Sequence, residues 1–190
     1  MAKTASKMVP LGSPAPDFSL PDVHGQIVRR DDAAGRPMVV AFICNHCPFV
    51  VHLRAGLRDF GRDLEPLLTL VAINSNDPVA HPADAPAAMA IAAAAAGYTF
   101  PYLFDASQAV ARAYGAACTP DFFLFDASHH LRYRGQFDGS RPDNAVPVTG
   151  ADLRAACIAV LAGQPVPEPQ RPSLGCNIKW RPDGAPQTKA

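Results

Sequence analysis

The stretch that decides the fold spans residues 38 to 48 and reads Met38-Val39-Val40-Ala41-Phe42-Ile43-Cys44-Asn45-His46-Cys47-Pro48. Its first six residues are apolar and rich in valine, which is typical of a strand that is covered on both faces. The proline that follows suits the first turn of a helix. Two thiols three residues apart, between a buried strand and a helix, predict a dithiol redox centre that can close a small disulfide ring.

The two cysteines are expected to have different roles. Cys44 is predicted to be the nucleophile, because the positive end of the helix and its backbone donors would stabilise its thiolate. Cys47, one turn further on, is predicted to resolve the mixed disulfide. An imidazolium at His46 would favour the thiolate and hence the reduced form, so the potential is expected to lie above the value of about −270 mV that is typical of thioredoxin.

The rest of the chain supplies the other elements of an α/β protein. The expected order is a loop and hairpin at 12–26, a strand at 37–43, a helix after Pro48, a strand at 67–73, a peripheral helix at 86–96, a strand at 101–104, a helix at 107–114, strands at 122–125 and 131–135, and a last helix that ends at Gly163. A central mixed sheet flanked by helices follows from this order. We expect one domain over residues 9–163 and a proline-rich tail over residues 164–190 that packs on it, since six of the 20 prolines follow Gly163.

Composition limits the classes of function. The chain has 190 residues, of which 48% are hydrophobic and 18% charged, as in an ordinary globular protein. Lysine plus arginine and aspartate plus glutamate number 17 each, so no broad electrostatic field would attract nucleic acid or an anionic membrane. The N-terminal residues contain no apolar stretch long enough for a signal peptide, and no window approaches a membrane span, so the cytoplasm is the expected compartment. Five cysteines without small-scaffold spacing predict thiols that are reduced or cycling.

Several separated motifs resemble those of one superfamily. The order of elements resembles the thioredoxin fold, and residues 12–26 resemble the entry segment of the redoxin and AhpC/TSA superfamily, which is peroxiredoxin-like. Thr119-Pro120 stands just before a strand, where that fold carries its cis-proline. The segments 42–50, 118–122 and 175–180 together are similar to a peroxiredoxin-like branch with a CxxC motif. The resemblance spans about residues 9 to 163 and implies a redox-active disulfide or an antioxidant peroxidase activity.

The resemblance also assigns roles to residues outside the dithiol. Thr119 and Pro120 are expected to pack against the dithiol and to shape the docking of an extended substrate. Met38 stands near the position where thioredoxins carry a buried acid, so a different proton route is expected in this chain. Cys118 is a candidate third thiol, with core packing as its alternative. Cys176 is a candidate resolving or regulatory thiol, provided that the tail folds back toward Cys44.

Departures from the superfamily pattern rank the candidate activities. In that superfamily a threonine or serine normally stands three residues before the peroxidatic cysteine. In this chain the residue three before Cys47 is Cys44, and the residue three before Cys44 is Ala41. Thiol-disulfide exchange is therefore the first hypothesis, with protein or small-molecule disulfides as substrates and a cellular dithiol as reductant. The alternative is an atypical thiol peroxidase that forms a sulfenic acid and is resolved by the other cysteine or by Cys176.

A third hypothesis belongs to another class, because Cys44, Cys47 and a histidine are ligands that suit Cu(I). A zinc half-site or a pair of structural cysteines are further alternatives for the motif, but no second CxxC pair accompanies it. We expect no cofactor and no resident metal ion. Nucleic acid and membranes are not expected as partners.

Overall fold

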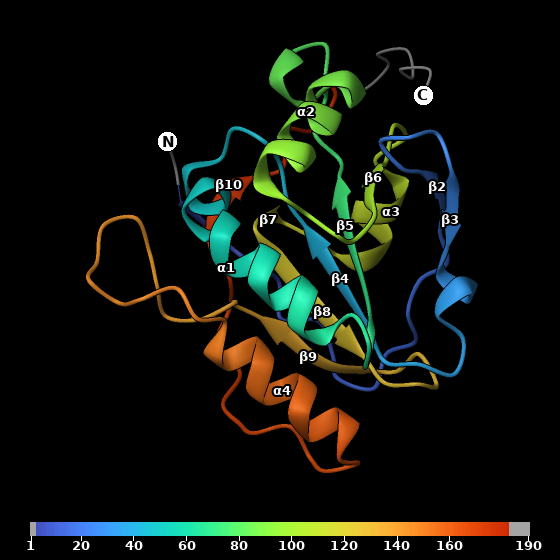
Figure 1. Cartoon of the computed structure of the whole chain (residues 1–190), viewed down its shortest axis with the longest axis vertical. Helices are drawn as coiled ribbons and strands as arrows, with labels where there is room; N and C mark the ends of the chain where they lie inside the picture. Colours follow the sequence, from blue (N-terminus) through green and yellow to red (C-terminus); the bar gives the residue numbers. More distant parts are fainter. Residues whose placement is uncertain (1–2, 183–190) are drawn as a thin grey trace.

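A five-stranded mixed sheet forms the centre of the structure, a computed structural model that describes residues 3–182 (Figure 1). Its strands are ordered β6-β5-β4-β8-β9. β4 runs parallel to β5 and antiparallel to β8, while β5 runs parallel to β6 and β8 antiparallel to β9. The bounds are β4 Met38–Phe42, β5 Thr69–Asn74, β6 Tyr102–Phe104, β8 Asp121–Phe125 and β9 Leu131–Gly135.

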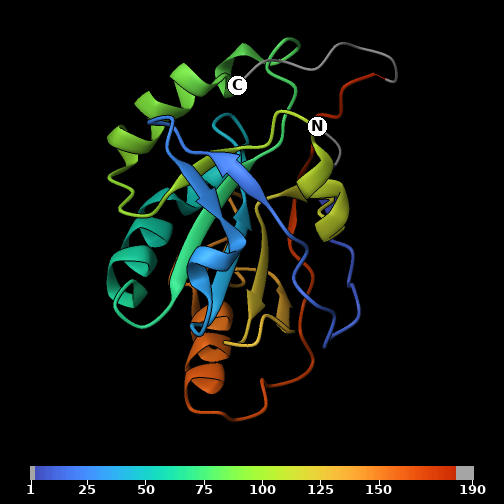
Figure 2. The same ribbon diagram turned by 90° about the vertical axis from the view of Figure 1, so that its right-hand side faces the viewer.

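Helices and a hairpin cover the two faces of this sheet (Figures 1 and 2). α1 (Pro48–Leu64), α2 (Pro86–Ala96) and α4 (Ala151–Leu161) contribute to one buried cluster. α3 (Ala109–Tyr114) contributes to a second cluster, together with residues of the hairpin β2 (Ser19–Pro21) and β3 (Ile27–Arg29). Two 3-10 helices, η1 (Arg30–Ala33) and η2 (Pro82–Asp84), complete the helical elements of the described residues.

β4 holds the two halves of the core together. Val39 and Ala41 belong to the cluster under α1, whereas Val40 and Phe42 belong to the cluster under α3. Successive side chains of a strand point to opposite faces of the sheet, so a strand that is covered on both faces must be apolar at every position. This requirement explains the unbroken apolar run of the sequence, and the run delivers the cysteine loop to the carboxyl end of β4.

Two strands at the ends of the chain join a second sheet. β1 (Lys3–Ala5), β10 (Leu174–Asn177) and β7 (Cys118–Thr119) form a three-stranded sheet in the order β1-β10-β7. None of these three strands was predicted from the sequence. β10 approaches β7 so closely that a Cβ atom at Gly175 would lie 2.0 Å from the carbonyl oxygen of Thr119. A glycine is therefore required at this position by the space available to it.

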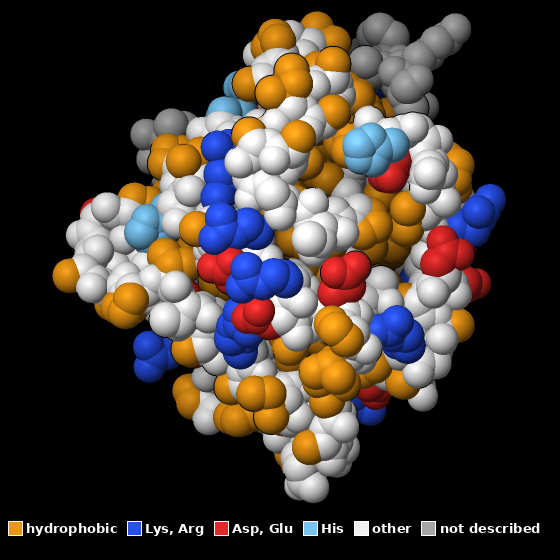
Figure 3. Space-filling model, viewed as in Figure 1, with side chains coloured by type: hydrophobic (Ala, Val, Ile, Leu, Met, Phe, Trp, Pro, Cys, Tyr) orange, Lys and Arg blue, Asp and Glu red, His pale blue; other side chains and the backbone are white. Residues whose placement is uncertain are grey.

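The surface agrees with a chain of zero net charge. On the face shown in Figure 3, basic and acidic side chains are intermixed over α1. Arg58 and Arg62 both pair with Asp59, and Arg154 pairs with Asp63. Exposed pairs of this kind contribute about 0–1 kcal/mol each to stability and leave no strong field. None of the described helices is long and apolar enough to cross a membrane.

The predicted fold class is confirmed, with a central mixed sheet flanked by helices. The elements at 86–96 and 131–135 have the predicted bounds, and the second parallel strand covers 69–74 instead of 67–73. Gly97 ends α2 in the left-handed conformation, with φ of 69°. The expected tail contributes β10, and its residues 183–190 lie outside the described part of the chain.

Gly175→Ala is expected to destabilise the protein, because the added methyl group would collide with the Thr119 carbonyl. Overpacking of this kind costs about 1–3 kcal/mol or more. Urea unfolding monitored by circular dichroism measures the change. Gly139→Ala is the matched control, since its Cβ would come no closer than 3.9 Å to Val146. Equal stability of the two variants would contradict the close approach of β10 to β7.

Candidate functional site

The cysteine loop precedes helix α1 and does not form its first turn. α1 begins at Pro48, and its N-cap residue is Cys47, which has an extended backbone with φ of −67° and ψ of 123°. A residue that precedes proline is forced out of the helical region by the proline ring, so the helix cannot extend back to Cys44. The expected placement of Cys44 at the helix start is therefore wrong, and Cys47 is the cysteine that faces the helix N-terminus.

The loop between β7 and β8 contacts both thiols. The Sγ atom of Cys44 lies 3.3 Å from Oγ1 of Thr119, and Sγ of Cys47 lies 3.1 Å from the carbonyl oxygen of Thr119. The peptide bond between Thr119 and Pro120 is cis, as the resemblance implied. The solvent-exposed fractions are 1% for Cys44 and 0% for Cys47. Access to these sulfur atoms therefore requires movement of the segments that cover them.

Strand β10 is one of these covering segments. It pairs antiparallel with β7, and Cys176 stands opposite Thr119 in the register. It also packs against α1. The backbone edge of β7, which we expected to receive an extended substrate, is thus already paired with the protein's own chain. The role of Thr119 and Pro120 in substrate docking stays a prediction, and docking at this edge would require β10 to move away.

The dithiol shares a proton unequally. The pKa of Cys47 is lowered to about 5, first because the Cys44 thiol donates a hydrogen bond to it. The Cys176 side chain and backbone and the Val50 backbone add further hydrogen bonds that favour the thiolate, against the cost of burial. The pKa of Cys44 is raised by the same hydrogen bond, by burial and by the charge of Asp84. The two thiols therefore titrate as one coupled pair, and the directions of the two pKa shifts favour the thiolate on Cys47.

The two additional thiols differ in their relation to the dithiol. Cys176 is buried, hydrogen-bonds to Cys47, and has its pKa raised to about 11, mainly by burial. Cys118 is fully buried, and its thiol donates to the Pro120 carbonyl at 3.5 Å. Burial and the charge of Asp121 raise the pKa of Cys118. The structure thus brings Cys176 into contact with Cys47, whereas the Cys118 thiol is bonded to the backbone.

A buried acid that was not predicted from the sequence lies beside Cys44. Asp84, at the end of η2, has no solvent-exposed surface. Its carboxylate accepts hydrogen bonds from the backbone N–H of Asn45 at 2.8 Å, from Asn76 Nδ2 at 2.8 Å and from Asn74 Nδ2 at 3.2 Å. Asn45 Nδ2 in turn donates to the Ala83 carbonyl at 2.7 Å. Hydrogen bonds from the peripheral segment before α2 therefore hold the cysteine loop in position.

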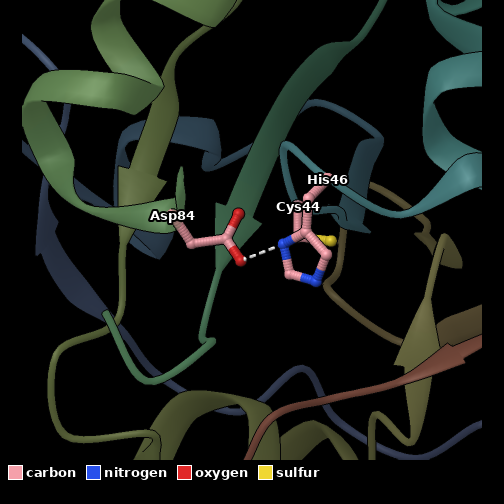
Figure 4. Close-up of side chains that lie close together, drawn as sticks. All are labelled: Cys44, His46 and Asp84. Atoms are coloured by element: carbon pink, nitrogen blue, oxygen red, sulfur yellow. Dashed lines mark ion pairs between the residues drawn. The ribbon is translucent and has the colours of Figure 1, made fainter. Parts of the chain in front are cut away.

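His46 lies between this carboxylate and Cys44 (Figure 4). Its Nδ1 atom is 2.7 Å from Oδ2 of Asp84, and its ring stacks on His81 with centroids 5.3 Å apart. Ligand atoms of Cys44, His46 and Asp84 all lie within 4.8 Å of one another. Asp84 escaped notice because it stands in a polar, proline-bearing loop. The one available signal was the run of polar residues from Asn74 that follows a buried parallel strand, since such strand ends carry binding residues.

Comparison with known proteins agrees with this architecture. Residues 11–134 match the AhpC/TSA family. An uncharacterized conserved protein from Geobacillus kaustophilus is 50% identical over 97% of this chain and 99% of its own, with a TM-score of 0.94. A hypothetical protein from Sinorhizobium meliloti 1021 is 52% identical over 94% of this chain and 98% of its own, with a TM-score of 0.92. No curated protein matches the chain.

More distant structures share the fold. A putative thiol:disulfide interchange protein DsbE from Chlorobium tepidum is 23% identical over 80% of this chain and 98% of its own, with a TM-score of 0.62. At this level of identity the likeness concerns the thioredoxin-like fold. Function is carried by residues placed on a fold and must be argued from the site itself.

Cys44→Ala is expected to raise the pKa of Cys47 from about 5. A hydrogen bond to a charged group contributes about 1.5–3 kcal/mol, so its loss should move the midpoint up by about one to two pH units. On acidification, the Cys47 thiolate of the variant would therefore be protonated at a higher pH than that of the unmodified protein. Ultraviolet absorbance of the thiolate during a pH titration of the reduced protein measures this midpoint.

Two further variants make that titration specific. Cys176→Ala should raise the midpoint by less, because Cys44 is the larger contributor. Cys118→Ser should leave the midpoint unchanged, because its thiol is bonded to the Pro120 carbonyl. An unchanged midpoint in Cys44→Ala would contradict the shared proton.

Proposed function

Because the chain belongs to the AhpC/TSA family and has the thioredoxin-like fold, we propose that it is a thiol-disulfide oxidoreductase that uses the Cys44 and Cys47 pair. The observation that carries the proposal is the hydrogen-bonded dithiol, held against the Thr119 loop with one proton shared between its sulfur atoms. A pair with one stabilised thiolate and one adjacent thiol has the two groups that disulfide exchange needs.

The exchange begins with the thiolate of Cys47, which differs from the nucleophile that the sequence indicated. This thiolate attacks one sulfur of a substrate disulfide, a mixed disulfide forms, and the first substrate thiolate leaves and takes up a proton. Cys44 then loses its proton and attacks Sγ of Cys47. The mixed disulfide breaks, the second substrate thiolate leaves, and Cys44 and Cys47 are joined. A cellular dithiol reverses these steps and restores the reduced protein.

His46 and the Thr119 loop have supporting roles in this proposal. The imidazole lies next to Cys44, where it can accept the proton that Cys44 must release in the second step. The Thr119 carbonyl and hydroxyl position the two sulfur atoms, since each contacts one of them. The cytoplasm, as the compartment where a dithiol reductant is available, remains the sequence-based expectation.

The test is turnover of insulin or glutathione disulfide by the purified full-length chain with a dithiol reductant. Cys44→Ser and Cys47→Ser should each lose turnover on the order of 10³-fold or more, as when a covalent nucleophile is removed. Cys157→Ala is the control, because this thiol is buried on α4, outside the cysteine loop, the Thr119 loop and β10. Full activity in both serine variants would refute the proposal.

The redox equilibrium with glutathione provides an independent measurement. A stabilised thiolate favours the reduced form, so the midpoint potential should lie above about −270 mV. Mass spectrometry of the oxidised protein should identify a disulfide between Cys44 and Cys47. A midpoint below this value, or a pairing that excludes both residues, would contradict the proposed centre.

One observation favours a second candidate, an atypical thiol peroxidase. Cys47 has a lowered pKa and hydrogen-bonds to both Cys44 and Cys176, so two thiols are available to resolve it. Its thiolate would attack a peroxide oxygen, break the O–O bond and become a sulfenic acid while the hydroxide or alkoxide leaves. Either neighbouring thiol would then form a disulfide and release water. Peroxide consumption no faster than that of a free thiol would exclude this candidate.

A further inference from the structure

Three side chains around the dithiol form a compact set of metal-ligating atoms. Cys44 offers a sulfur atom, His46 a ring nitrogen and Asp84 a carboxylate oxygen, and these atoms lie within 4.8 Å of one another (Figure 4). A thiolate, an imidazole and a carboxylate are the three ligand types that proteins use for Zn²⁺. Three protein ligands also leave the fourth tetrahedral position open.

The carboxylate of this set is fixed in place before any ion arrives. Asp84 is fully buried, and its Oδ1 atom accepts from the backbone of Asn45 and from Asn74, while Oδ2 accepts from Asn76. Ligating carboxylates in metal sites are oriented by hydrogen bonds of this kind. Burial of a carboxylate is costly without a compensating partner, and three N–H donors supply part of that compensation.

The imidazole ring of His46 is also held in place, but its Nδ1 nitrogen makes no hydrogen bond within the described residues. Nδ1 of His46 is buried and lies 2.7 Å from Asp84, yet within the described residues it has no hydrogen-bond partner of suitable geometry. The stack on His81 fixes the plane of the ring. The His46 side chain is 26% exposed, so the site lies near the surface although Cys44 and Asp84 are buried. A buried nitrogen without a hydrogen bond, beside a thiol and a carboxylate, is suited to a metal ion.

We propose that Cys44, His46 and Asp84 bind one Zn²⁺ ion in the reduced protein. The Cys44 thiol releases its proton to the solvent on binding, so that a thiolate and a carboxylate neutralise the two positive charges. Water or the neighbouring sulfur of Cys47 occupies the fourth position. The carboxylate distinguishes this site from a Cu(I) site, which is selected by soft sulfur ligands.

The site couples metal binding to the redox state of the dithiol, and this coupling rests on the proposed oxidoreductase function. A disulfide between Cys44 and Cys47 removes the thiolate ligand, so oxidation releases the ion. Conversely, bound Zn²⁺ withholds Cys44 from disulfide formation and slows the exchange reaction. Zinc is thus a reversible inhibitor of the reduced form.

The test is titration of the reduced, metal-free chain with Zn²⁺ in competition with a chromophoric chelator. We expect one equivalent to bind, and none to bind to the oxidised protein. Co²⁺ serves as a spectroscopic probe and should give the visible bands of a tetrahedral site and a sulfur-to-metal charge-transfer band. Failure to bind Zn²⁺ in the reduced protein would overturn the proposal.

Variants separate this site from simple chelation by two thiols. Asp84→Asn and His46→Gln should each weaken Zn²⁺ binding by about 10–100-fold. His81→Ala is the matched control, because it removes the stacked ring without removing a ligand, and should weaken binding less. His46 is partly exposed, so His46→Gln gives a readout even if Asp84→Asn fails to fold. Unchanged affinity in His46→Gln, with loss in Cys47→Ser, would assign binding to the dithiol alone and refute the site.

Disulfide exchange is measured in parallel with excess chelator present. Activity without zinc binding would refute the metal site and leave the oxidoreductase proposal intact. Zinc binding without activity would refute the oxidoreductase proposal and leave the ligand set standing. Activity that zinc does not inhibit would overturn the proposed coupling.

Discussion

The contact between Thr119 and the two thiols is the interaction on which the candidate site depends. The hydroxyl and the carbonyl of this one residue each face one sulfur atom. The contact exists because β4 and β8 pair antiparallel, which brings the end of β4 and the start of β8 to the same edge of the sheet. Strand β4, which is apolar on both faces, therefore has two roles. It contributes to the core on each side of the sheet, and it positions the cysteine loop against the loop that precedes β8.

Pro48 determines which of the two cysteines adjoins the N-terminus of α1. Because proline excludes the preceding residue from the helical conformation, Cys47 becomes the N-cap of α1 and Cys44 stays in the turn before it. The thiolate is then stabilised by donors that converge on Cys47 from Cys44, from Cys176 and from the first turn of the helix. The helix therefore begins about one turn later than the spacing alone suggests for a CxxC pair.

Elements at the edge of the domain complete the site. The segment before α2 supplies Asp84, which fixes the Asn45 backbone and lies against His46. Strand β10 supplies Cys176 and occupies the backbone edge of β7. Both elements come from parts of the chain that look peripheral in the sequence, and both contact the cysteine loop or the loop that faces it. The site therefore draws on four separate segments of the chain.

The sequence by itself determined the central architecture, because its signals are local. The alternation of buried strands and helices can be read from residues such as Val39, Val40 and Leu57, whose apolar character follows from which faces are covered. The CxxC spacing and the proline before β8 identified the dithiol and the loop against it. The environment of Asp84, the pairing of Cys176 with Thr119 and the position of Cys47 at the N-cap of α1 were decided only by the tertiary structure. These features arise from contacts between residues that are distant in the chain, and neither periodicity nor composition encodes such contacts.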